Sequence, residues 1–247
     1  MRQHGNGLLG SCATIAARKP GMHVAEFDQH AANYKLALDR SLALAGESSD
    51  YFTDYKAAYI ERLLVGKKST KILDFGCGIG TLSSALARRR RDDCIDGYDV
   101  SSASLDRVEP DLRARGVFTD KVEDLSRDYD LIVLSNVMHH IPVAARQATI
   151  DDLAARLAPG GRLLVIEHNP LNPLTRWVVA HCEFDGDAVL LWPREVKTYF
   201  AQAKLGEPQR DYILFFPKAL AALRGVEKSL RWCPAGAQYA LWATRAK

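Results

Sequence analysis

The feature that most constrains the fold is the stretch ILDFGCGIGT at residues 72–81, where a short apolar segment runs directly into three glycines. Residues 71–75 are predicted to form a buried strand, and Leu82, Ala85 and Leu86 follow at helical spacing. A strand, a glycine-rich turn and a helix in immediate succession are typical of a doubly wound α/β sheet. The sequence therefore predicts a ligand at the carboxyl end of this strand.

Strand-like and helix-like segments continue to alternate after the glycines. Further strands are expected at residues 94–100, 117–119, 131–135, 162–167, 212–216 and 239–244. Helical patterns lie between them at residues 104–113, 144–157 and 193–203. This alternation predicts an α/β fold with a Rossmann-like, doubly wound and mostly parallel sheet, in one catalytic domain over residues 67–247.

Two segments lie outside this alternation. Residues 1–21 carry glycines and polar residues and are expected to be a disordered tail, whereas residues 22–66 contain two amphipathic helical patterns and are expected to form a helical cap. A long insertion at about residues 168–192 interrupts the alternation of strands and helices. Because it follows a strand and carries Trp177, Phe184 and Trp192, it is predicted to line the pocket of a substrate.

Composition and charge narrow the function classes. The 247 residues are 47% hydrophobic and carry a net charge of +3, so a nucleic-acid partner is not expected. The dense basic run at residues 88–91 is expected to end a helix. Five cysteines without a C-x-x-C pair predict a cytoplasmic protein with neither disulfides nor a metal site, and no apolar run is long enough for a membrane span.

Asp74 decides between two kinds of glycine loop. A dinucleotide-binding loop has the pattern G-x-G-x-x-G. If Gly76 is its first glycine, the third should stand at position 81, but that residue is Thr81 and the third glycine comes one position earlier, at Gly80. A carboxylate at the entrance of the loop would repel a pyrophosphate and attract an ammonium or a sulfonium. The loop therefore favours S-adenosylmethionine, which brings positive charge and no phosphate.

Asp99 follows the second predicted strand in the stretch GYDVS. A carboxylate at this place can accept hydrogen bonds from both hydroxyls of a ribose, which favours an adenosine-containing cofactor without choosing between the two kinds. The alternative is a helix cap or a turn residue, a role that Ser101 or Ser102 could also fill.

Four ordered segments, LDFGCGIGTLS, GYDVS, YDLIVLSNVMHHI and LAPGGRLLVIE, resemble class I S-adenosylmethionine-dependent methyltransferases of the small-molecule type. The resemblance implies a seven-stranded sheet whose last strand is antiparallel. It implies that Asp74 and the glycine loop hold the methionine moiety, Asp99 the ribose and Asp120 the adenine, with Glu123 and Asp124 as alternatives for the last role. The residues expected to bind the cofactor are Asp74, Gly76, Cys77, Gly78, Gly80, Asp99, Val100, Asp120, Ser135 and Asn136.

Candidate catalytic residues are histidines that follow strands. Methyl transfer from a sulfonium depends largely on alignment, and a base is needed only where the acceptor must lose a proton. His140 occupies a position that the resembled family often fills with histidine, and His168 begins the long insertion. A structural hydrogen bond is the alternative role for His140, and His139 is expected to be exposed or packed.

The sequence predicts methyl transfer to a small-molecule acceptor at oxygen, nitrogen or carbon, and leaves the acceptor and the oligomeric state open. An RNA or protein methyltransferase is the first alternative, although SNVM at residues 135–138 differs from the N-P-P-Y-like segment of amino-directed nucleic-acid enzymes. The other alternative functions are a nicotinamide-dependent oxidoreductase and a cofactor-binding module without activity.

Overall fold

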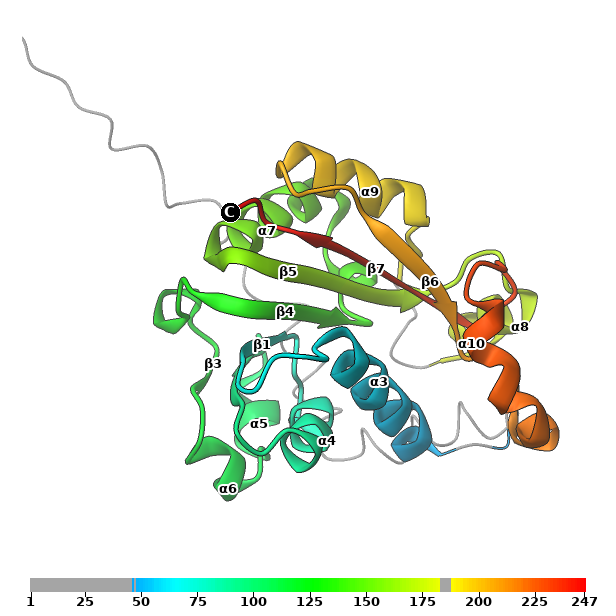
Figure 1. Cartoon of the computed structure of the whole chain (residues 1–247), viewed down its shortest axis with the longest axis horizontal. Helices are drawn as coiled ribbons and strands as arrows, with labels where there is room; N and C mark the ends of the chain where they lie inside the picture. Colours follow the sequence, from blue (N-terminus) through cyan, green and yellow to red (C-terminus); the bar gives the residue numbers. More distant parts are fainter. Residues whose placement is uncertain (1–45, 47, 183–187) are drawn as a thin grey trace, which may run out of the picture.

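The computed structural model describes residues 46, 48–182 and 188–247, and its centre is a seven-stranded sheet (Figure 1). The strands are β1 (Lys71–Phe75), β2 (Cys94–Tyr98), β3 (Phe118–Thr119), β4 (Tyr129–Ser135), β5 (Leu157–His168), β6 (Gln209–Ile213) and β7 (Gln238–Thr244). Their order is β3-β2-β1-β4-β5-β7-β6, and β7 runs antiparallel to both of its neighbours. The predicted Rossmann-like sheet with an antiparallel last strand is confirmed.

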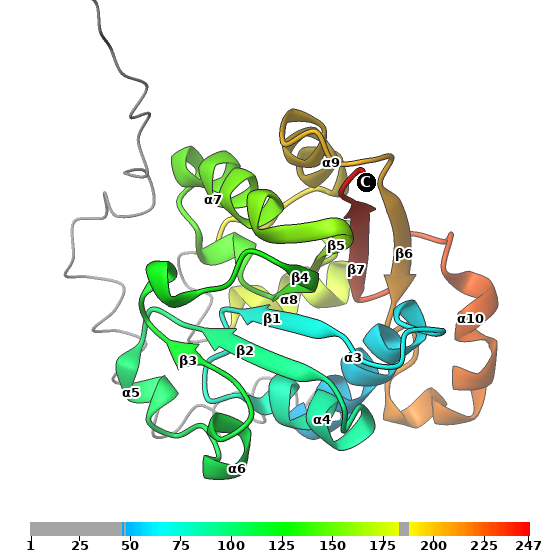
Figure 2. The same ribbon diagram turned by 60° about the vertical axis from the view of Figure 1, so that its left-hand side comes forward.

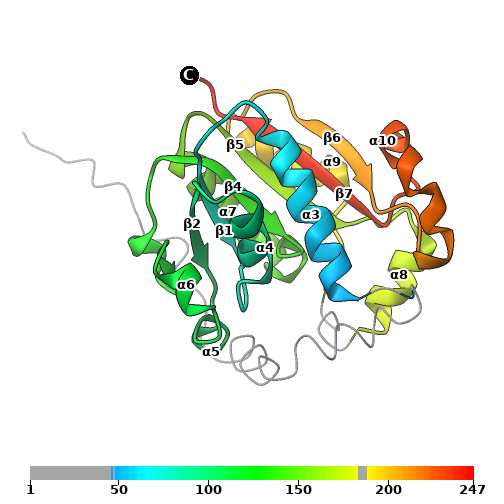
Figure 3. The same cartoon turned by 60° about the horizontal axis from the view of Figure 1, so that its bottom comes forward.

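Helices cover both faces of the sheet (Figure 2). The α-helices are α3 (Ser49–Leu63), α4 (Thr81–Arg89), α5 (Ser102–Leu105), α6 (Pro110–Arg113), α7 (Val143–Arg156), α8 (Pro173–Ala180), α9 (Pro193–Gln202) and α10 (Glu227–Leu230). Short 3₁₀ helices are η2 (Val122–Asp124), η3 (Met138–His140) and η4 (Lys218–Val226). Helices α3 and α4 lie together on one face, where α3 crosses the sheet beside α4 (Figure 3), and α7 and α9 cover the other.

Alternation along the strands decides which side chains reach which face. In β1, Leu73 and Phe75 pack in the apolar cluster of α7 and α9, whereas Ile72 packs in the cluster of α3 and α4. Asp74 therefore points toward α3 and α4. By the same alternation Ser135 at the end of β4 shares that face, and Glu167 in β5 faces α7.

Three predicted boundaries are wrong for identifiable reasons. The helix expected at 104–113 is two short helices, because α5 ends at Leu105 and Pro110, which suits the first position of a helix, begins α6. Strand β5 begins at Leu157 rather than Arg162, since Tyr129 pairs with Leu157 before the register shifts. Strand β6 ends at Ile213, because Leu214 has φ of +61° and turns the chain.

Helix α3 lies where the second helical pattern of residues 22–66 is predicted, while the first pattern lies outside the described residues, so the helical cap stays a prediction. Ala57 and Ile60 of α3 pack against Ile72 of β1 and Leu86 of α4, so α3 is joined to the sheet through a shared core. Within the part of the chain that the structure describes, no helix is long and apolar enough to cross a membrane.

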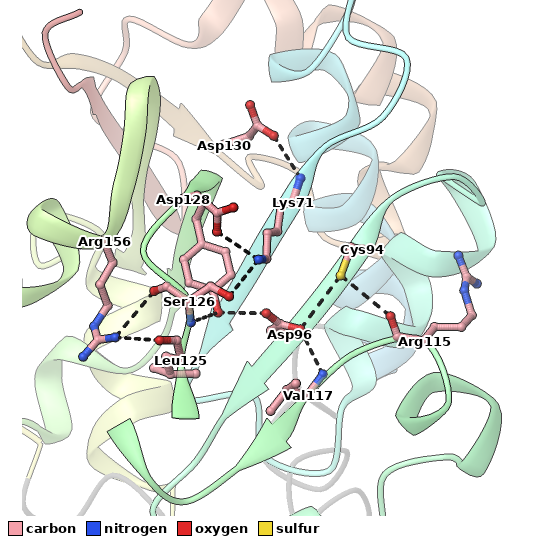
Figure 4. Close-up of polar contacts among 11 residues, drawn as sticks. Lys71, Cys94, Asp96, Arg115, Val117, Leu125, Ser126, Asp128, Asp130 and Arg156 are labelled. Atoms are coloured by element: carbon pink, nitrogen blue, oxygen red, sulfur yellow. Dashed lines mark hydrogen bonds and ion pairs between the residues drawn. The ribbon is translucent and has the colours of Figure 1, made fainter. Parts of the chain in front are cut away.

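A network of polar side chains connects the strands near their amino-terminal ends, away from the glycine loop (Figure 4). The buried Asp96 carboxylate accepts a hydrogen bond from the Tyr129 hydroxyl at 2.8 Å and another from the Val117 N–H at 2.9 Å. Lys71 Nζ donates to the Asp128 carboxylate at 2.9 Å. These bonds connect the starts of neighbouring strands.

Candidate active site

The glycine loop folds back onto the end of β2. The N–H groups of Gly76 and Cys77 both donate to the Tyr98 carbonyl, at 2.7 and 3.0 Å. Gly76 has φ of +82°, and a Cβ there would lie 2.4 Å from Val137 Cγ2, so only glycine fits. Gly78 also has a positive φ, but a Cβ on it would meet nothing within 4 Å. The loop therefore leaves open space over Gly78.

Asp99 connects this loop with the end of β2. Its Oδ2 accepts a hydrogen bond from the Gly78 N–H at 2.7 Å, and its Oδ1 accepts one from the Ser101 N–H at 2.9 Å. The cap of α5 is Ser101, whose hydroxyl accepts from the Ser104 N–H at 3.1 Å. A carboxylate offers about four acceptor positions, so each oxygen of Asp99 can take part in more than one hydrogen bond.

Asp74 is buried behind the loop, with only 2% of its surface exposed. Its Oδ2 accepts a hydrogen bond from the Ser83 hydroxyl of α4 at 2.7 Å. Burial raises the pKa of Asp74 to about 6, which the Ser83 bond and the charge of Lys56 offset only in part. An additional positive charge nearby would favour the ionised form, so the local electrostatics suit a cationic ligand.

Lys56 was not among the residues expected from the sequence. It projects from α3, and its Nζ donates to Ser135 Oγ at 2.9 Å and to Asn136 Oδ1 at 3.3 Å. Burial lowers the pKa of this ammonium to about 8, against the opposing effect of the Glu167 and Asp74 carboxylates. One signal was available, because Lys56 interrupts the apolar face formed by Phe52, Tyr59 and Leu63.

Asn136 joins Lys56 to His168. A lysine ammonium can only donate, so the Asn136 atom that it contacts is the carbonyl oxygen, which also accepts from Gln238 Nε2 at 3.2 Å. The amide nitrogen of Asn136 then faces His168 Nε2 at 3.2 Å. His168 Nε2 must accept this bond, which places the imidazole proton on Nδ1. Asn136 holds this position with φ of +57°, a conformation that asparagine tolerates.

A second polar cluster forms around Glu167, on the other face of the sheet. Its Oε1 accepts from the N–H groups of Val137 and Met138 at 3.0 and 2.7 Å, and its Oε2 contacts His139 Nδ1 at 2.6 Å. Burial alone would raise the pKa of Glu167, but His139, His168 and the Met138 N–H lower it to about 2. Glu167 is therefore ionised and fixes the proton of His139 on Nδ1.

Three histidines, His139, His140 and His168, lie close together at the carboxyl ends of β4 and β5. The ring centroids of His139 and His140 are 4.1 Å apart, and those of His139 and His168 are 5.2 Å apart. His139 is packed, with 2% exposure, whereas His140 and His168 are partly exposed. Sequence reasoning named all three histidines but missed Glu167, which orients His139.

The other residues predicted to bind the cofactor lie around the glycine loop, and their side chains differ in solvent exposure. Cys77 is buried and Val100 is partly buried, each packed against an apolar cluster. Asp120 is exposed and follows Thr119, whose carbonyl accepts from the Asp99 N–H at 3.3 Å. The adenine role thus stays a prediction, with Asp120 at the correct edge of the sheet.

The insertion after β5 contains α8, whose start is capped by Asn172 through a 3.0 Å bond from the Thr175 N–H. Trp177 and Trp192 are partly exposed, at 45% and 39%, and Phe184 lies outside the described residues. Among residues 46, 48–182 and 188–247, no group of three or more histidine, cysteine or carboxylate side chains is placed to hold a metal ion.

Comparison with known proteins gives a family match over most of the chain. A family model described as a methyltransferase domain matches residues 49–218, which extend from α3 to the start of η4. These residues include the glycine loop and both polar clusters.

Curated relatives match the chain over shorter regions. A ubiquinone biosynthesis O-methyltransferase from Alkalilimnicola ehrlichii is 26% identical over 126 residues, covering 47% of this chain and 49% of the relative. Ribosomal RNA small subunit methyltransferase C from Acinetobacter baumannii is 26% identical over 141 residues, covering 53% of this chain and 42% of the relative. The chain thus spans about half the length of these curated relatives.

Among solved structures, a SAM-dependent methyltransferase from Archaeoglobus fulgidus superposes with a TM-score of 0.63 at 13% identity. The match covers 80% of this chain and 95% of the other. At this identity the likeness concerns the fold.

Proposed function

The chain belongs to the class I S-adenosylmethionine-dependent methyltransferases, and on this premise we propose that it methylates a hydroxyl oxygen of a small molecule. The observation that carries the choice of oxygen is the convergence of His139, His140 and His168 next to Glu167. A hydroxyl must lose its proton to become a good nucleophile, and imidazoles accept protons near neutral pH. The ubiquinone biosynthesis O-methyltransferase relative agrees with this choice.

The cofactor placement is part of the proposal, and the residues present fit it. Bound S-adenosylmethionine supplies a methyl group on a sulfonium, which is open to in-line displacement. The open space over Gly78 would receive it, with Asp99 accepting bonds from the ribose hydroxyls and the buried Asp74 attracting the positive charge of the methionine moiety. Gly76, Cys77, Gly80, Val100, Asp120, Ser135 and Asn136 would complete the binding site.

His140 and His168 would contact the acceptor, since both are partly exposed at the carboxyl ends of the strands. His139 is a positioning residue in this proposal, because it is buried between Glu167 and the other two imidazoles. Glu167 holds His139 in one orientation, and His139 in turn supports the neighbouring ring. The insertion at 168–192, with Trp177 and Trp192, would line the acceptor site.

Ribosomal RNA is the competing acceptor, because one relative methylates it by name. Three arginines of the basic run that would serve such a partner, Arg88, Arg89 and Arg90, already lie beside carboxylates. Arg88 lies 3.7 Å from Asp54 and Arg89 lies 3.2 Å from Glu61. Together with the net charge of +3, this favours a small molecule over a polyanion.

Label transfer tests the proposal. Purified protein with methyl-labelled S-adenosylmethionine would be supplied with small phenols and catechols, matched amines, and ribosomal RNA. Label in hydroxyl compounds, with a rate that rises with pH in wild type and loses this rise in His140→Ala, supports it. His140→Ala should lower kcat about 100-fold or more, because His140 is the proposed base, with unchanged affinity for S-adenosylhomocysteine. His168→Ala should lower kcat less, because His168 Nε2 already accepts from the Asn136 amide and His168 would contact the acceptor without taking its proton. Label in amines alone or in RNA alone would overturn it.

Binding measurements on the same purified protein test the two remaining alternatives, a nicotinamide-dependent oxidoreductase and a cofactor-binding module without activity. Stabilisation by NAD with none by S-adenosylhomocysteine would contradict the cofactor placement. Binding of S-adenosylhomocysteine without transfer to any acceptor would instead identify a cofactor-binding module.

A further inference from the structure

The segment of residues 218–232, which contains η4 and α10 between β6 and β7, exposes large apolar side chains. Figures 1 and 3 show it at the outside of the molecule, past the end of β6. No residue of η4 is buried, although the helix contains the apolar run ALAAL. Four large side chains of the segment are exposed, namely Leu220 at 46%, Leu223 at 46%, Val226 at 51% and Trp232 at 74%. Exposed apolar side chains collected in one short segment indicate a surface that another molecule covers.

The inner side of this segment is joined to the rest of the fold. Buried Glu227 accepts hydrogen bonds from the N–H groups of Phe215 and Phe216, both at 3.2 Å. The guanidinium of Arg224 lies 4.1 Å from the centre of the Tyr51 ring of α3. These contacts hold the segment against α3 and the end of β6, so its exposed apolar side chains belong to a defined surface.

The exposed charges of the same segment are positive. Glu227 is the only carboxylate side chain in residues 212–247, and it is buried. Lys218 and Lys228 are exposed, and neither forms an ion pair with another described residue. An exposed apolar segment with unpaired cations has the composition of a surface that binds anionic lipid.

We propose that residues 218–232 dock this protein on a lipid bilayer that contains anionic headgroups. Leu220, Leu223 and Trp232 enter the boundary between headgroups and acyl chains, a depth that tryptophan favours in membrane proteins. Lys218 and Lys228 then meet the lipid phosphates, which supply the negative charge that the segment lacks on its outer side.

The docking segment begins and ends at the carboxyl edge of the sheet. Ile213 at the end of β6 pairs with Gln238 at the start of β7, and Gln238 pairs with His168 of β5. Docking therefore brings this edge toward the bilayer. Vesicle binding requires neither cofactor nor acceptor, so the inference is independent of the proposed function.

Other occupants fit this surface less well. In a twofold dimer the same surface meets itself, so the unpaired lysines of both copies would face each other without an exposed carboxylate. An RNA backbone would use the lysines and leave Leu220 and Leu223 without an apolar partner. A bilayer matches the apolar and the charged side chains together.

Co-sedimentation of the full chain with lipid vesicles tests the inference. Vesicles of phosphatidylcholine alone are compared with vesicles of phosphatidylcholine and phosphatidylglycerol. We expect binding to the mixed vesicles, weakened by added salt. Lys218→Gln and Lys228→Gln should each weaken it about fivefold. Leu223→Ser and Trp232→Ser should each weaken it about tenfold or more, because each removes an apolar side chain from the boundary.

Matched controls come from the opposite edge of the sheet. Val65→Ser and Lys68→Gln remove an exposed apolar side chain and an exposed lysine between α3 and β1, and should leave vesicle binding unchanged. Trp232→Phe keeps an apolar ring and should keep binding, but should lose most of the shift of tryptophan emission to shorter wavelength that docking produces in the wild-type chain. Thermal unfolding of each variant verifies the fold.

No binding to either kind of vesicle, or equal binding to both, would overturn the inference. Equal losses in Val65→Ser and Trp232→Ser would also overturn it, because the effect would then be independent of this surface. A dimer in analytical ultracentrifugation that Leu223→Ser dissociates would assign the surface to a second copy instead. Binding of RNA without binding of vesicles, weakened in Lys218→Gln, would assign it to a nucleic acid.

Discussion

Alanine at Gly76 should mainly lower the stability of the protein, whereas alanine at Gly78 should mainly weaken cofactor binding. Both residues have positive φ, so a side chain costs about 1–2 kcal/mol of backbone strain in either place. At Gly76 the new Cβ also lies 2.4 Å from Val137 Cγ2, and overpacking of this kind adds about 1–3 kcal/mol. Gly76→Ala should therefore lower the free energy of unfolding by about 2–5 kcal/mol.

At Gly78 the new Cβ meets no protein atom within 4 Å, so Gly78→Ala should lose only the strain, about 1–2 kcal/mol. The methyl group would, however, occupy the space proposed for the cofactor. Affinity for S-adenosylhomocysteine should fall by about tenfold or more, which corresponds to about 1.4 kcal/mol.

Urea unfolding and calorimetric titration of both variants measure these effects. A double-mutant cycle with Val137→Ala isolates the overlap, and should give a coupling energy of about 1–3 kcal/mol with Gly76→Ala and none with Gly78→Ala. Equal destabilisation by the two alanines, or full cofactor affinity in Gly78→Ala, would refute this reasoning about the loop.

Three further substitutions probe the buried polar groups. Glu167→Gln replaces the acceptor of His139 by an amide and should lower the free energy of unfolding by about 2–3 kcal/mol and reduce kcat, measured in urea and by label transfer. Asp74→Asn should stabilise the free protein by up to about 3 kcal/mol above pH 6, because its folded pKa of about 6 exceeds the ordinary 3.8; the gain should vanish below about pH 4, while cofactor affinity falls. Tyr129→Phe removes the bond to Asp96 and should cost about 1–2 kcal/mol in urea without changing cofactor affinity.

Local pattern sufficed for the parts of the site that are contiguous in sequence. The glycine loop, Asp74 and Asp99 could be placed because each directly ends or follows a strand, and the strand order of an α/β sheet brings such ends together. The boundaries failed where a single residue changed the backbone, as Leu214 does with its positive φ. Such a conformation for leucine depends on tertiary packing and has no sequence signature.

Contacts between distant elements could not be predicted in the same way. Lys56 meets Ser135 across 79 residues, and His139 meets Glu167 across 28. Each pairing depends on how α3 crosses the sheet or on the register of β4 and β5. The lysine on an apolar helical face was visible in the sequence, but only the packed helix shows which acceptors it reaches.

The three buried charges differ in whether the fold itself compensates them. Hydrogen bonds and His139 lower the pKa of Glu167 to about 2, so its charge is stabilised without a ligand. Burial instead raises the pKa of Asp74 to about 6 and lowers that of Lys56 to about 8. Glu167 therefore has the energetics of an orienting residue, whereas the cost of burying the charges of Asp74 and Lys56 is only partly offset within the fold.

This difference predicts that the protein releases protons when the cofactor binds near pH 6. Cationic groups of the cofactor would lower the pKa of Asp74, so at pH 6 the protein should release up to about half a proton. Calorimetry of S-adenosylhomocysteine binding in buffers of different ionisation enthalpy measures the release. Asp74→Asn should abolish it, and subtraction of the variant from wild type removes the titration of the ligand. Identical proton exchange in wild type and Asp74→Asn would show that the Asp74 carboxylate does not meet the cofactor.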